Sequence, residues 1–288
     1  MLKEKTKLLW ENWIKITNDR CHLHFKLEHN NLNKHIKICI DVGDQTAERV
    51  SNDINLEPKN ILDIGSSVGF NSIGLSRKYK DSLIVGIEPD KEACQIANKM
   101  AQDFKKTNVR FVSGVCETLP FCDNQFDLII CHTVIEHVRN VENSIDEIAR
   151  VLKPNGLLHI EAPNYIWPWE PHLGIVTTPL CPKPLMRFLA KIQKAGNEIY
   201  YIDHLQPVNP IWLERLFKKN NLTWINRSKT KYLKAAKEET KDIAASKNLT
   251  LFYKFFSFLR FVGLATFLAK IALKFNFYPS ILYTVKKQ

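Results

Sequence analysis

The sequence predicts an α/β protein built around a doubly wound parallel sheet. From residue 60 to residue 162, apolar runs of strand length alternate with longer amphipathic stretches. This pattern is typical of βαβ units. The runs are continuous in Val, Ile and Leu, as expected of parallel strands buried on both faces. The connections between them are short, which favours a doubly wound arrangement. The predicted strands are 60–64, 83–88, 109–112, 126–131 and 156–162.

Length and charge narrow the class of protein. A chain of 288 residues, 45% hydrophobic and 25% charged, is typical of a globular protein with a substantial core. Its charge is uneven, because residues 183–288 hold 20 Lys or Arg against 6 Asp or Glu, a net +14, whereas residues 1–182 carry −3. The basic C-terminal third indicates a polyanionic partner, which is either an anionic membrane surface or nucleic acid.

The cysteines and the N-terminus indicate a cytoplasmic protein. The seven cysteines are odd in number and form neither a CxxC pair nor a His/Cys cluster of zinc spacing. We therefore expect reduced thiols and no metal site. The first residues, MLKEKTKLLWENWIKI, have charges throughout and no apolar core of signal-peptide length, so we expect no export.

Residues that follow the first two strands predict a nucleotide-like ligand, because ligands of such sheets bind outside the carboxyl ends of the strands. In the stretch ILDIGSSVGF, Gly65 and Gly69 let the backbone approach a ligand, and Asp63 can pair with a cationic group. Glu88 ends the second strand and is suited to hold two ribose hydroxyls. Together they indicate a nucleoside that carries a positive charge.

A dinucleotide is the rival ligand. Its G-x-G-x-x-G fingerprint would place glycines at positions 65, 67 and 70. The sequence has Ser67 and Phe70 at the last two, so a hydride-transfer enzyme is disfavoured.

Five motifs in order resemble those of class I S-adenosylmethionine-dependent methyltransferases of the type 11 domain group. LDIGSSVG is similar to the first motif, VGIEPD to the acidic ribose-binding loop, and VCETLPFCDNQFDLIICHTVIEHV to the segment with LPF, FD and EHV. LKPNG is similar to the turn before the fifth strand. The resemblance covers residues 58–163. It implies a Rossmann-like, seven-stranded methyltransferase sheet and S-adenosyl-L-methionine as the cofactor.

The resemblance also implies cofactor-binding residues at the strand ends: Asp63, Gly65, Ser66, Ser67, Gly69, Glu88, Pro89, Glu117 and His132. Two positions depart from the family pattern. Ser67 replaces the middle glycine of the first motif, in a turn that accepts a small residue. Val115 stands where an Asp commonly contacts the adenine amino group, so we expect Glu117 or the backbone to make that contact.

Four histidines are candidate general bases, His132, His137, His172 and His204, and of these His137 and His204 are the predicted catalytic residues. Methyl transfer depends mainly on holding the nucleophile in line with the leaving sulfur, and a general base helps when the acceptor is a hydroxyl. His137 occupies the EHV position, where the alternative role is to hold the loop closed and shape the cofactor pocket. His204 follows Asp203, which could orient its ring; the alternative is a surface or loop-packing role.

The resemblance and the composition divide the chain into four parts. Residues 1–57 are expected to form a helical cap over the cofactor cleft, with Trp10, Trp13, Ile14 and Ile16 on one amphipathic face, and residues 58–163 the cofactor-binding core. Residues 164–209, rich in Pro and aromatics, are expected to form a lid. This stretch resembles inserts in methyltransferases from bacterial cell-surface polysaccharide and lipid gene neighbourhoods, which implies a glycan or lipid-linked acceptor. Residues 210–288 complete the sheet.

An insertion at residues 229–279 contains the most apolar part of the chain. Lys254, Arg260, Lys270 and Lys274 interrupt it, so it is too charged to span a membrane. A helix on an anionic membrane surface fits better, because the last three of these cations project from nearby positions. The alternative is packing against the sheet or against a second subunit.

The sequence as a whole predicts a cytoplasmic methyltransferase, peripheral on the inner face of the membrane. Its expected acceptor is an oxygen, or in second place a nitrogen, of a small molecule, saccharide or lipid. One alternative is a catalytically inactive binding protein, motivated by Ser67 and Val115. The other is an RNA methyltransferase, motivated by the basic C-terminal third and disfavoured because no RNA-binding module is recognisable.

Overall fold

The computed structural model describes residues 2–21, 32–195, 199, 202–237 and 264–288. Lys254, Arg260 and the histidine-rich stretch near residue 25 lie outside these ranges, so the predictions made for them stay predictions. Within the described ranges, no helix combines the length and the apolar composition needed to cross a bilayer.

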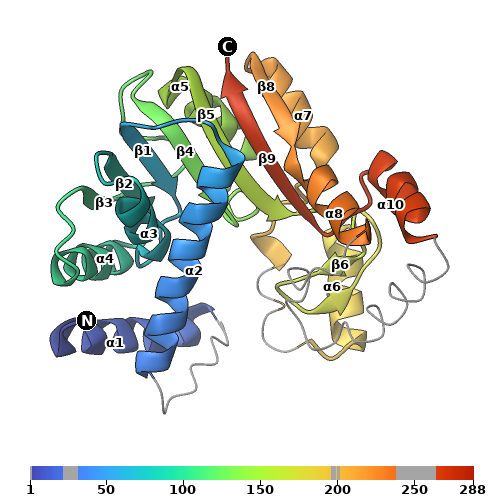
Figure 1. Ribbon diagram of the computed structural model, residues 1–288. Coiled ribbons are helices and arrows are strands. Elements are labelled where there is room, and N and C mark those ends of the chain that lie inside the picture. Colours follow the sequence, from blue (N-terminus) through green and yellow to red (C-terminus); the bar gives the residue numbers. More distant parts are fainter. Residues whose placement is uncertain (1, 22–31, 196–198, 200–201, 238–263) are drawn as a thin grey trace.

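A seven-stranded sheet forms the centre of the molecule (Figure 1). Its order is β3-β2-β1-β4-β5-β9-β8, in which β1 to β5 run parallel and β9 runs antiparallel to both of its neighbours. This confirms the predicted sheet. Strands β1 to β3 are added in one direction across the sheet and β4 and β5 in the other, so the strand order reverses between β1 and β4. The strands are β1 Asn60–Ile64, β2 Leu83–Glu88, β3 Val109–Ser113, β4 Phe126–His132, β5 Leu152–Pro163, β8 Leu222–Asn226 and β9 Ser280–Lys287.

Helices cover both faces of the sheet, which explains why its strands are apolar throughout. On one face, Ile61 and Ile84 pack in a core with residues of α2, α3 and α4. On the other face, the next residues of the same strands, Leu62 and Val85, pack in a core with α5 and α7. The helices are α1 Glu4–Cys21, α2 Leu32–Asp53, α3 Phe70–Lys78, α4 Lys91–Asp103, α5 Val141–Val151, α6 Lys183–Ile192, α7 Pro210–Lys219, α8 Arg227–Lys237 and α10 Ala265–Lys274.

Helices α1 and α2 lie beside the parallel half of the sheet. Helix α2 packs against α3, and α1 packs against α4. Trp10 and Ile14 are buried as predicted, but Ile16 is 38% exposed. The indole N–H of Trp13 donates to Asp90, whose carboxylate also accepts two backbone N–H groups as the N-cap of α4. Through Trp13, helix α1 therefore contacts the carboxyl end of strand β2.

The stretch from residue 164 to residue 209 folds as a small unit of its own. A hairpin of β6 (Trp169–Glu170) and β7 (Ile175–Val176) packs with α6 around buried apolar residues that include Tyr165, Met186 and Ile202. The unit is attached to the loop after β4, because the backbone N–H of Gln206 donates to the Glu136 carbonyl at 2.8 Å. It therefore stands beside the carboxyl end of β4.

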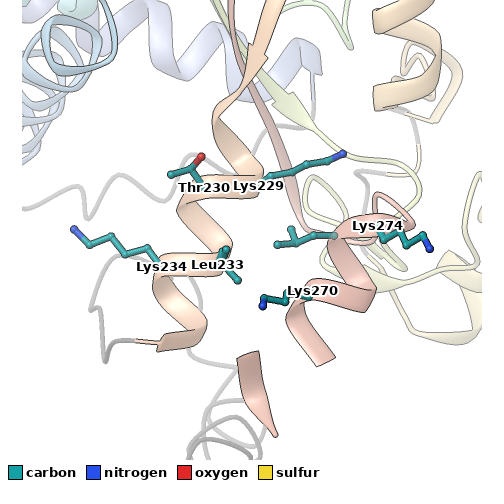
Figure 2. Close-up of a pocket in the computed structure, with 7 residues that line it drawn as sticks. Lys229, Thr230, Leu233, Lys234, Lys270 and Lys274 are labelled. Atoms are coloured by element: carbon teal, nitrogen blue, oxygen red, sulfur yellow. The ribbon is translucent and has the colours of Figure 1, made fainter. Parts of the chain in front are cut away.

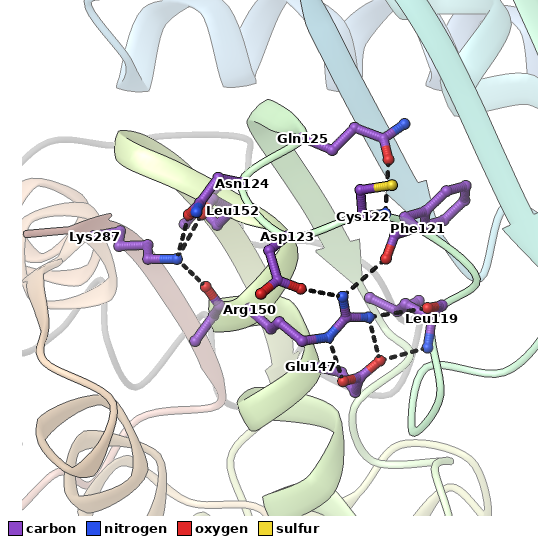
Figure 3. A network of polar contacts seen from close by, with 11 residues as sticks. Leu119, Phe121, Cys122, Asp123, Asn124, Gln125, Glu147, Arg150, Leu152 and Lys287 are labelled. Carbon is purple, nitrogen blue, oxygen red and sulfur yellow. Dashed lines mark hydrogen bonds and ion pairs between the residues drawn. The ribbon is translucent and has the colours of Figure 1, made fainter.

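Arg150 near the end of α5 fastens the loop that precedes β4 (Figure 3). Its guanidinium donates twice to Glu147, at 2.7 and 2.8 Å, and once to Asp123, at 2.7 Å. It also donates to the carbonyls of Phe121 and Leu119, at 2.8 and 3.0 Å. The planar guanidinium of Arg150 therefore donates to five acceptor oxygens, which the single ammonium group of a lysine could not do.

Arg150→Met is expected to lower the free energy of unfolding by about 1–3 kcal/mol, because two backbone carbonyls and two carboxylates lose a charged donor. Urea denaturation measures the effect. The control is Lys78→Met, which removes an exposed ion pair with Glu48 and should lower the free energy of unfolding much less, because exposed pairs add little stability. Equal losses in both variants would show that the Arg150 contacts add no stability beyond that of a surface pair.

Candidate functional site

A cavity of about 670 Å³ opens at the carboxyl ends of β1, β2 and β4, where the sheet order reverses. This is the size range of pockets for small ligands. Ile64 and Gly65 line it from β1, Glu88 and Pro89 from β2. The remaining walls are residues 114–118 after β3, and residues 133, 134, 137–140 and 143 after β4. The prediction that strand ends carry the ligand site matches the position of this cavity.

Glu88 presents a carboxylate whose orientation is fixed by the backbone. The N–H of Ser67 donates to one of its oxygens at 3.0 Å, and the N–H of Asp90 donates to the other at 3.1 Å. Burial raises the pKa of Glu88, and these two backbone donors offset part of that rise. Each oxygen keeps acceptor capacity, so the group can receive hydrogen bonds from a ligand with two adjacent hydroxyls.

The turn after β1 depends on left-handed backbone conformations. Gly65 has φ +68° and Gly69 has φ +91°, and Ser67 between them has φ +48°. A Cβ on Gly65 would lie 2.3 Å from the Val134 side chain, and one on Gly69 would lie 2.5 Å from Phe111. The two glycines are thus required by the turn and by its packing, and Ser67 takes the left-handed conformation that glycine adopts at lower cost.

Asp63 lies beneath this turn and does not line the cavity. Its side chain is almost fully buried and accepts a 2.6 Å hydrogen bond from the Ser72 hydroxyl in α3. Ser66 is also buried, and its hydroxyl has no partner among the described residues. In the structure Asp63 therefore joins the turn to α3, and its contact with the cofactor stays a prediction.

Burial raises the pKa of Asp63 to about 7. The folded state then keeps a proton that the unfolded chain, with its ordinary value of 3.8, loses on going from pH 4 to pH 7. The stability that this group contributes is complete below about pH 4 and is lost as the pH rises through 7, with a slope of up to about 1.4 kcal/mol per pH unit.

In Asp63→Asn, the free energy of unfolding is therefore expected to depend less steeply on pH between about 4.5 and 6.5. The change in slope should correspond to about one bound proton. Urea denaturation at several pH values measures the slope. Asp41→Asn, on the exposed side of α2, is the control. An Asp63→Asn slope equal to that of the control would show that Asp63 does not hold the extra proton.

The loop after β3 supplies the cavity wall opposite the glycine turn. Val115, at the position where the family commonly has an Asp, lines the cavity and is 42% exposed. Glu117 also lines it, and one of its carboxylate oxygens accepts from the backbone N–H groups of Arg139 and Asn140, at 2.6 and 3.4 Å. Glu117 thus connects the loops after β3 and β4 and has acceptor capacity left for a ligand.

The loop after β4 places a histidine in the cavity and a carboxyl group behind it. His137 lines the cavity, and burial lowers its pKa to about 4, so its ring is neutral at pH 7. Glu136 is completely buried, and burial raises its pKa to about 7. His172 of the 164–209 unit reaches this loop, since its ring centroid lies 4.8 Å from that of His137.

Two other histidines predicted for the site lie away from the cavity lining. His132, the last residue of β4, contacts His159 at 2.7 Å and Arg49 of α2 at 3.5 Å. Burial holds the pKa of His132 well below 6.5. His204 is exposed, and the Asp203 carboxylate predicted to orient it accepts from Arg187. A catalytic role for His204 and cofactor contact by His132 stay predictions.

The sequence identified part of the cavity. Gly65, Glu88, Pro89, Glu117 and His137 line it as predicted candidates, and Ser66, Ser67 and Gly69 shape the turn at its edge. Further lining residues were not singled out for the site from the sequence, and most of them belong to the segment that follows β4: Thr133, Val134, Val138, Arg139, Asn140 and Asn143. Their position after a predicted strand was the available signal.

Comparison with known proteins agrees with this geometry. A family model described as a methyltransferase domain matches residues 62–160, which contain the cavity-lining residues. Methyltransferase YcgJ of Bacillus subtilis, which is uncharacterized, is 36% identical over 96 residues, or 33% of this chain and 37% of that protein. The C-methyltransferase UbiE of Rickettsia prowazekii is 35% identical over 103 residues, or 34% of this chain and 41% of that protein. The chain thus spans about two fifths of the length of these relatives.

Solved structures share the fold over most of the chain at low identity. The crystal structure of YcgJ has a TM-score of 0.52 at 17% identity and covers 85% of this chain and 98% of that one. Phosphoethanolamine N-methyltransferase 2 of Haemonchus contortus, solved with S-adenosylhomocysteine, has a TM-score of 0.52 at 14% identity, covering 85% of this chain and 52% of that one. At such identities these structures show the Rossmann-like methyltransferase fold. Residues 62–160 thus match a methyltransferase domain, and the chain is similar there to S-adenosylmethionine-dependent methyltransferases of class I.

Proposed function

We propose that the protein transfers a methyl group from S-adenosylmethionine to an oxygen of a small or lipid-linked saccharide or lipid acceptor at an anionic membrane surface. The observation that supports the reaction is the 670 Å³ cavity at the reversal point of the sheet, with the fixed carboxylate of Glu88 at one side. A nitrogen acceptor is second, because relatives bear the names of O-, N- and C-methyltransferases, so kinship leaves the target atom open.

The residues of the cavity fit the cofactor by their chemistry. Glu88 would receive the two ribose hydroxyls, and the loop that contains Val115 and Glu117 would hold the adenine. The backbone at Gly65, which has no Cβ, would pass close to the amino-acid end of the cofactor. The bound cofactor supplies a methyl group on a positively charged sulfur, and the chain has to hold the acceptor oxygen in line with it.

The acceptor would enter between the loop after β4 and the 164–209 unit. His137 lines the cavity on that side, and Gln206 ties the unit to the same loop through the Glu136 carbonyl and, at 3.1 Å, the Val138 carbonyl. A wall that belongs to a separate insert can differ between relatives while the cofactor half stays alike. The insert would therefore select the acceptor.

The membrane part of the proposal is supported by α10. Its exposed face combines large apolar side chains with lysines, as helices on membrane surfaces do. Leu264, at the N-cap, and Phe275, at the C-cap, extend the face at both ends. The apolar members, 42–69% exposed, are Leu264, Phe267, Leu268, Ile271 and Phe275.

Lysines from both helices line a hollow between α8 and α10, beside this face, and their side chains point in different directions (Figure 2). Lys229 and Lys234 reach it from α8, and Lys270 and Lys274 from α10. Each cation near an anionic lipid surface contributes about 1 kcal/mol to binding. The apolar face and the lysines together favour lipid over RNA, since RNA binding would not require the exposed Phe and Leu side chains.

Vesicle flotation tests the membrane proposal. The wild-type protein should float with anionic vesicles and not with neutral ones, and Lys270→Glu/Lys274→Glu should lose most of the binding, more so at low salt. Lys80→Glu/Lys91→Glu, exposed at the other end of the sheet, is the charge-matched control. Equal loss in the control, or RNA gel shifts in place of flotation, would contradict the lipid assignment.

Transfer of a labelled methyl group tests the reaction itself. The protein should label a fraction of cell-envelope glycans or lipids, and mass spectrometry should find products heavier by one methylene group. Labelling of RNA alone would show that the acceptor is RNA and not a glycan or lipid. Cofactor binding without transfer to any of these fractions would favour a catalytically inactive binding protein.

A further inference from the structure

Three potential metal ligands meet where the core touches the 164–209 unit. Glu136 and His137 follow β4, and His172 lies between β6 and β7. One ligand atom from each lies within 4.8 Å of the other two. The sequence spacing gives no hint of this, because His172 is far from the first two along the chain and only the packing of the unit brings it near.

Glu136 is the acidic member of this cluster. Its side chain is 0% exposed, and neither oxygen has a hydrogen-bond partner among the described residues. Nε2 of His137 lies 3.8 Å from this carboxylate, beyond hydrogen-bond distance. A charged carboxylate is unfavourable in a buried position without partners, and a bound cation would offset that cost.

His172 is already held as metal-binding histidines are. Its Nδ1 lies 2.6 Å from the carboxylate of Glu170, which is 1% exposed. Glu170 in turn accepts from the Leu173 N–H at 2.6 Å and from the Tyr165 hydroxyl at 3.4 Å. A carboxylate on one ring nitrogen orients the ring and makes the other nitrogen a better metal ligand. This arrangement assigns Nε2 of His172 to the ion.

We propose that Glu136, His137 and His172 bind one divalent ion of the zinc type. Two imidazoles and one carboxylate suit Zn²⁺ and similar transition-metal ions, whereas Mg²⁺ and Ca²⁺ prefer oxygen ligands. Zinc bonds of about 2.1 Å in a tetrahedron would separate ligand atoms by about 3.4 Å. The 3.8 Å between Glu136 and His137 is close to this value, and the His137 side chain, which is 34% exposed, has room to move toward the ion.

The position of this site determines what the ion would do. His137 lines the cavity and His172 belongs to the unit proposed to select the acceptor, so the ion would fasten that unit to the core at the cavity wall. Three protein ligands also leave one tetrahedral position open. Metal binding is independent of methyl transfer and can be measured on the protein without cofactor or acceptor.

Chelator-treated protein dialysed against Zn²⁺ tests the site. The wild type should bind one Zn²⁺ per chain and unfold at a higher temperature with it. Glu136→Gln and His172→Gln should bind at least about 100-fold more weakly, since even residues that only orient the ligands contribute 10–100-fold. Glu142→Gln, an exposed acid on α5, is the control and should bind as the wild type does.

Cobalt distinguishes this site from binding to the cysteines. Co²⁺ should give visible bands of a four-coordinate ion without the thiolate-to-cobalt charge-transfer band. That band, the absence of stoichiometric Zn²⁺ in the folded wild type, or unchanged affinity in His172→Gln would overturn the proposal. Because His172 is partly exposed on the attached unit, its variant tests the site even if Glu136→Gln does not fold.

Discussion

Glu88→Gln is expected to weaken the binding of S-adenosylmethionine by about 10- to 150-fold. The carboxylate would accept hydrogen bonds from both ribose hydroxyls while it keeps those from the Ser67 and Asp90 N–H groups. An amide has one acceptor atom, so its NH₂ group must face one of these backbone donors. Hydrogen bonds to a charged group contribute about 1.5–3 kcal/mol, which corresponds to this range of affinity.

Isothermal titration with S-adenosylmethionine and with its demethylated product measures the change. Glu92→Gln is the matched control, because Glu92 lies exposed on the first turn of α4, four residues from Glu88, and outside the cavity lining. Thermal unfolding of each variant separates lost affinity from lost structure. Equal affinity of a folded Glu88→Gln protein and the wild type would remove Glu88 from the cofactor site.

Gly65→Ala is expected to lower the free energy of unfolding by about 2–6 kcal/mol. Alanine would have to keep φ +68°, a strained conformation worth about 1–3 kcal/mol, and its Cβ would lie 2.3 Å from Val134. Forcing an extra methyl group into a packed site adds about 1–3 kcal/mol. Since Gly65 lines the cavity, cofactor affinity should fall as well.

A double-mutant cycle with Val134→Ala separates the two causes. Shortening Val134 removes the two atoms nearest to the new methyl group, at 2.3 and 3.0 Å, so Gly65→Ala should cost at least about 1 kcal/mol less in the Val134→Ala protein. The remaining cost is the backbone strain. Urea denaturation of the four proteins gives the coupling, and additive costs within about 0.5 kcal/mol would contradict the close contact.

The sheet could be predicted from the sequence because both of its faces are buried. Each parallel strand is then a continuous apolar run whose ends are clear, and β1 and β2 have the predicted bounds. Strand β5 begins at Leu152 rather than near residue 156, because Leu152 already pairs with Phe126 before an irregularity in the register. The sequence LKPNG is typical of a turn. The pairing of Leu152 depends on strand β4 beside it, which the local sequence does not show.

The residues of the site were harder to predict, since a strand end does not reveal which way each side chain points. Asp63 and Gly65 are two residues apart, yet Asp63 is buried against Ser72 and Gly65 lines the cavity. His132 likewise turns toward His159 and Arg49. These directions depend on helices α2 and α3, whose packing no local pattern specifies.

A crystal structure with S-adenosylhomocysteine tests the central claim most directly. The ligand should occupy the cavity at the carboxyl ends of β1, β2 and β4, with both ribose hydroxyls within hydrogen-bond distance of the Glu88 carboxylate and the adenine beside Val115 and Glu117. An unoccupied cavity at saturating ligand, or a ribose held by residues other than Glu88, would contradict it.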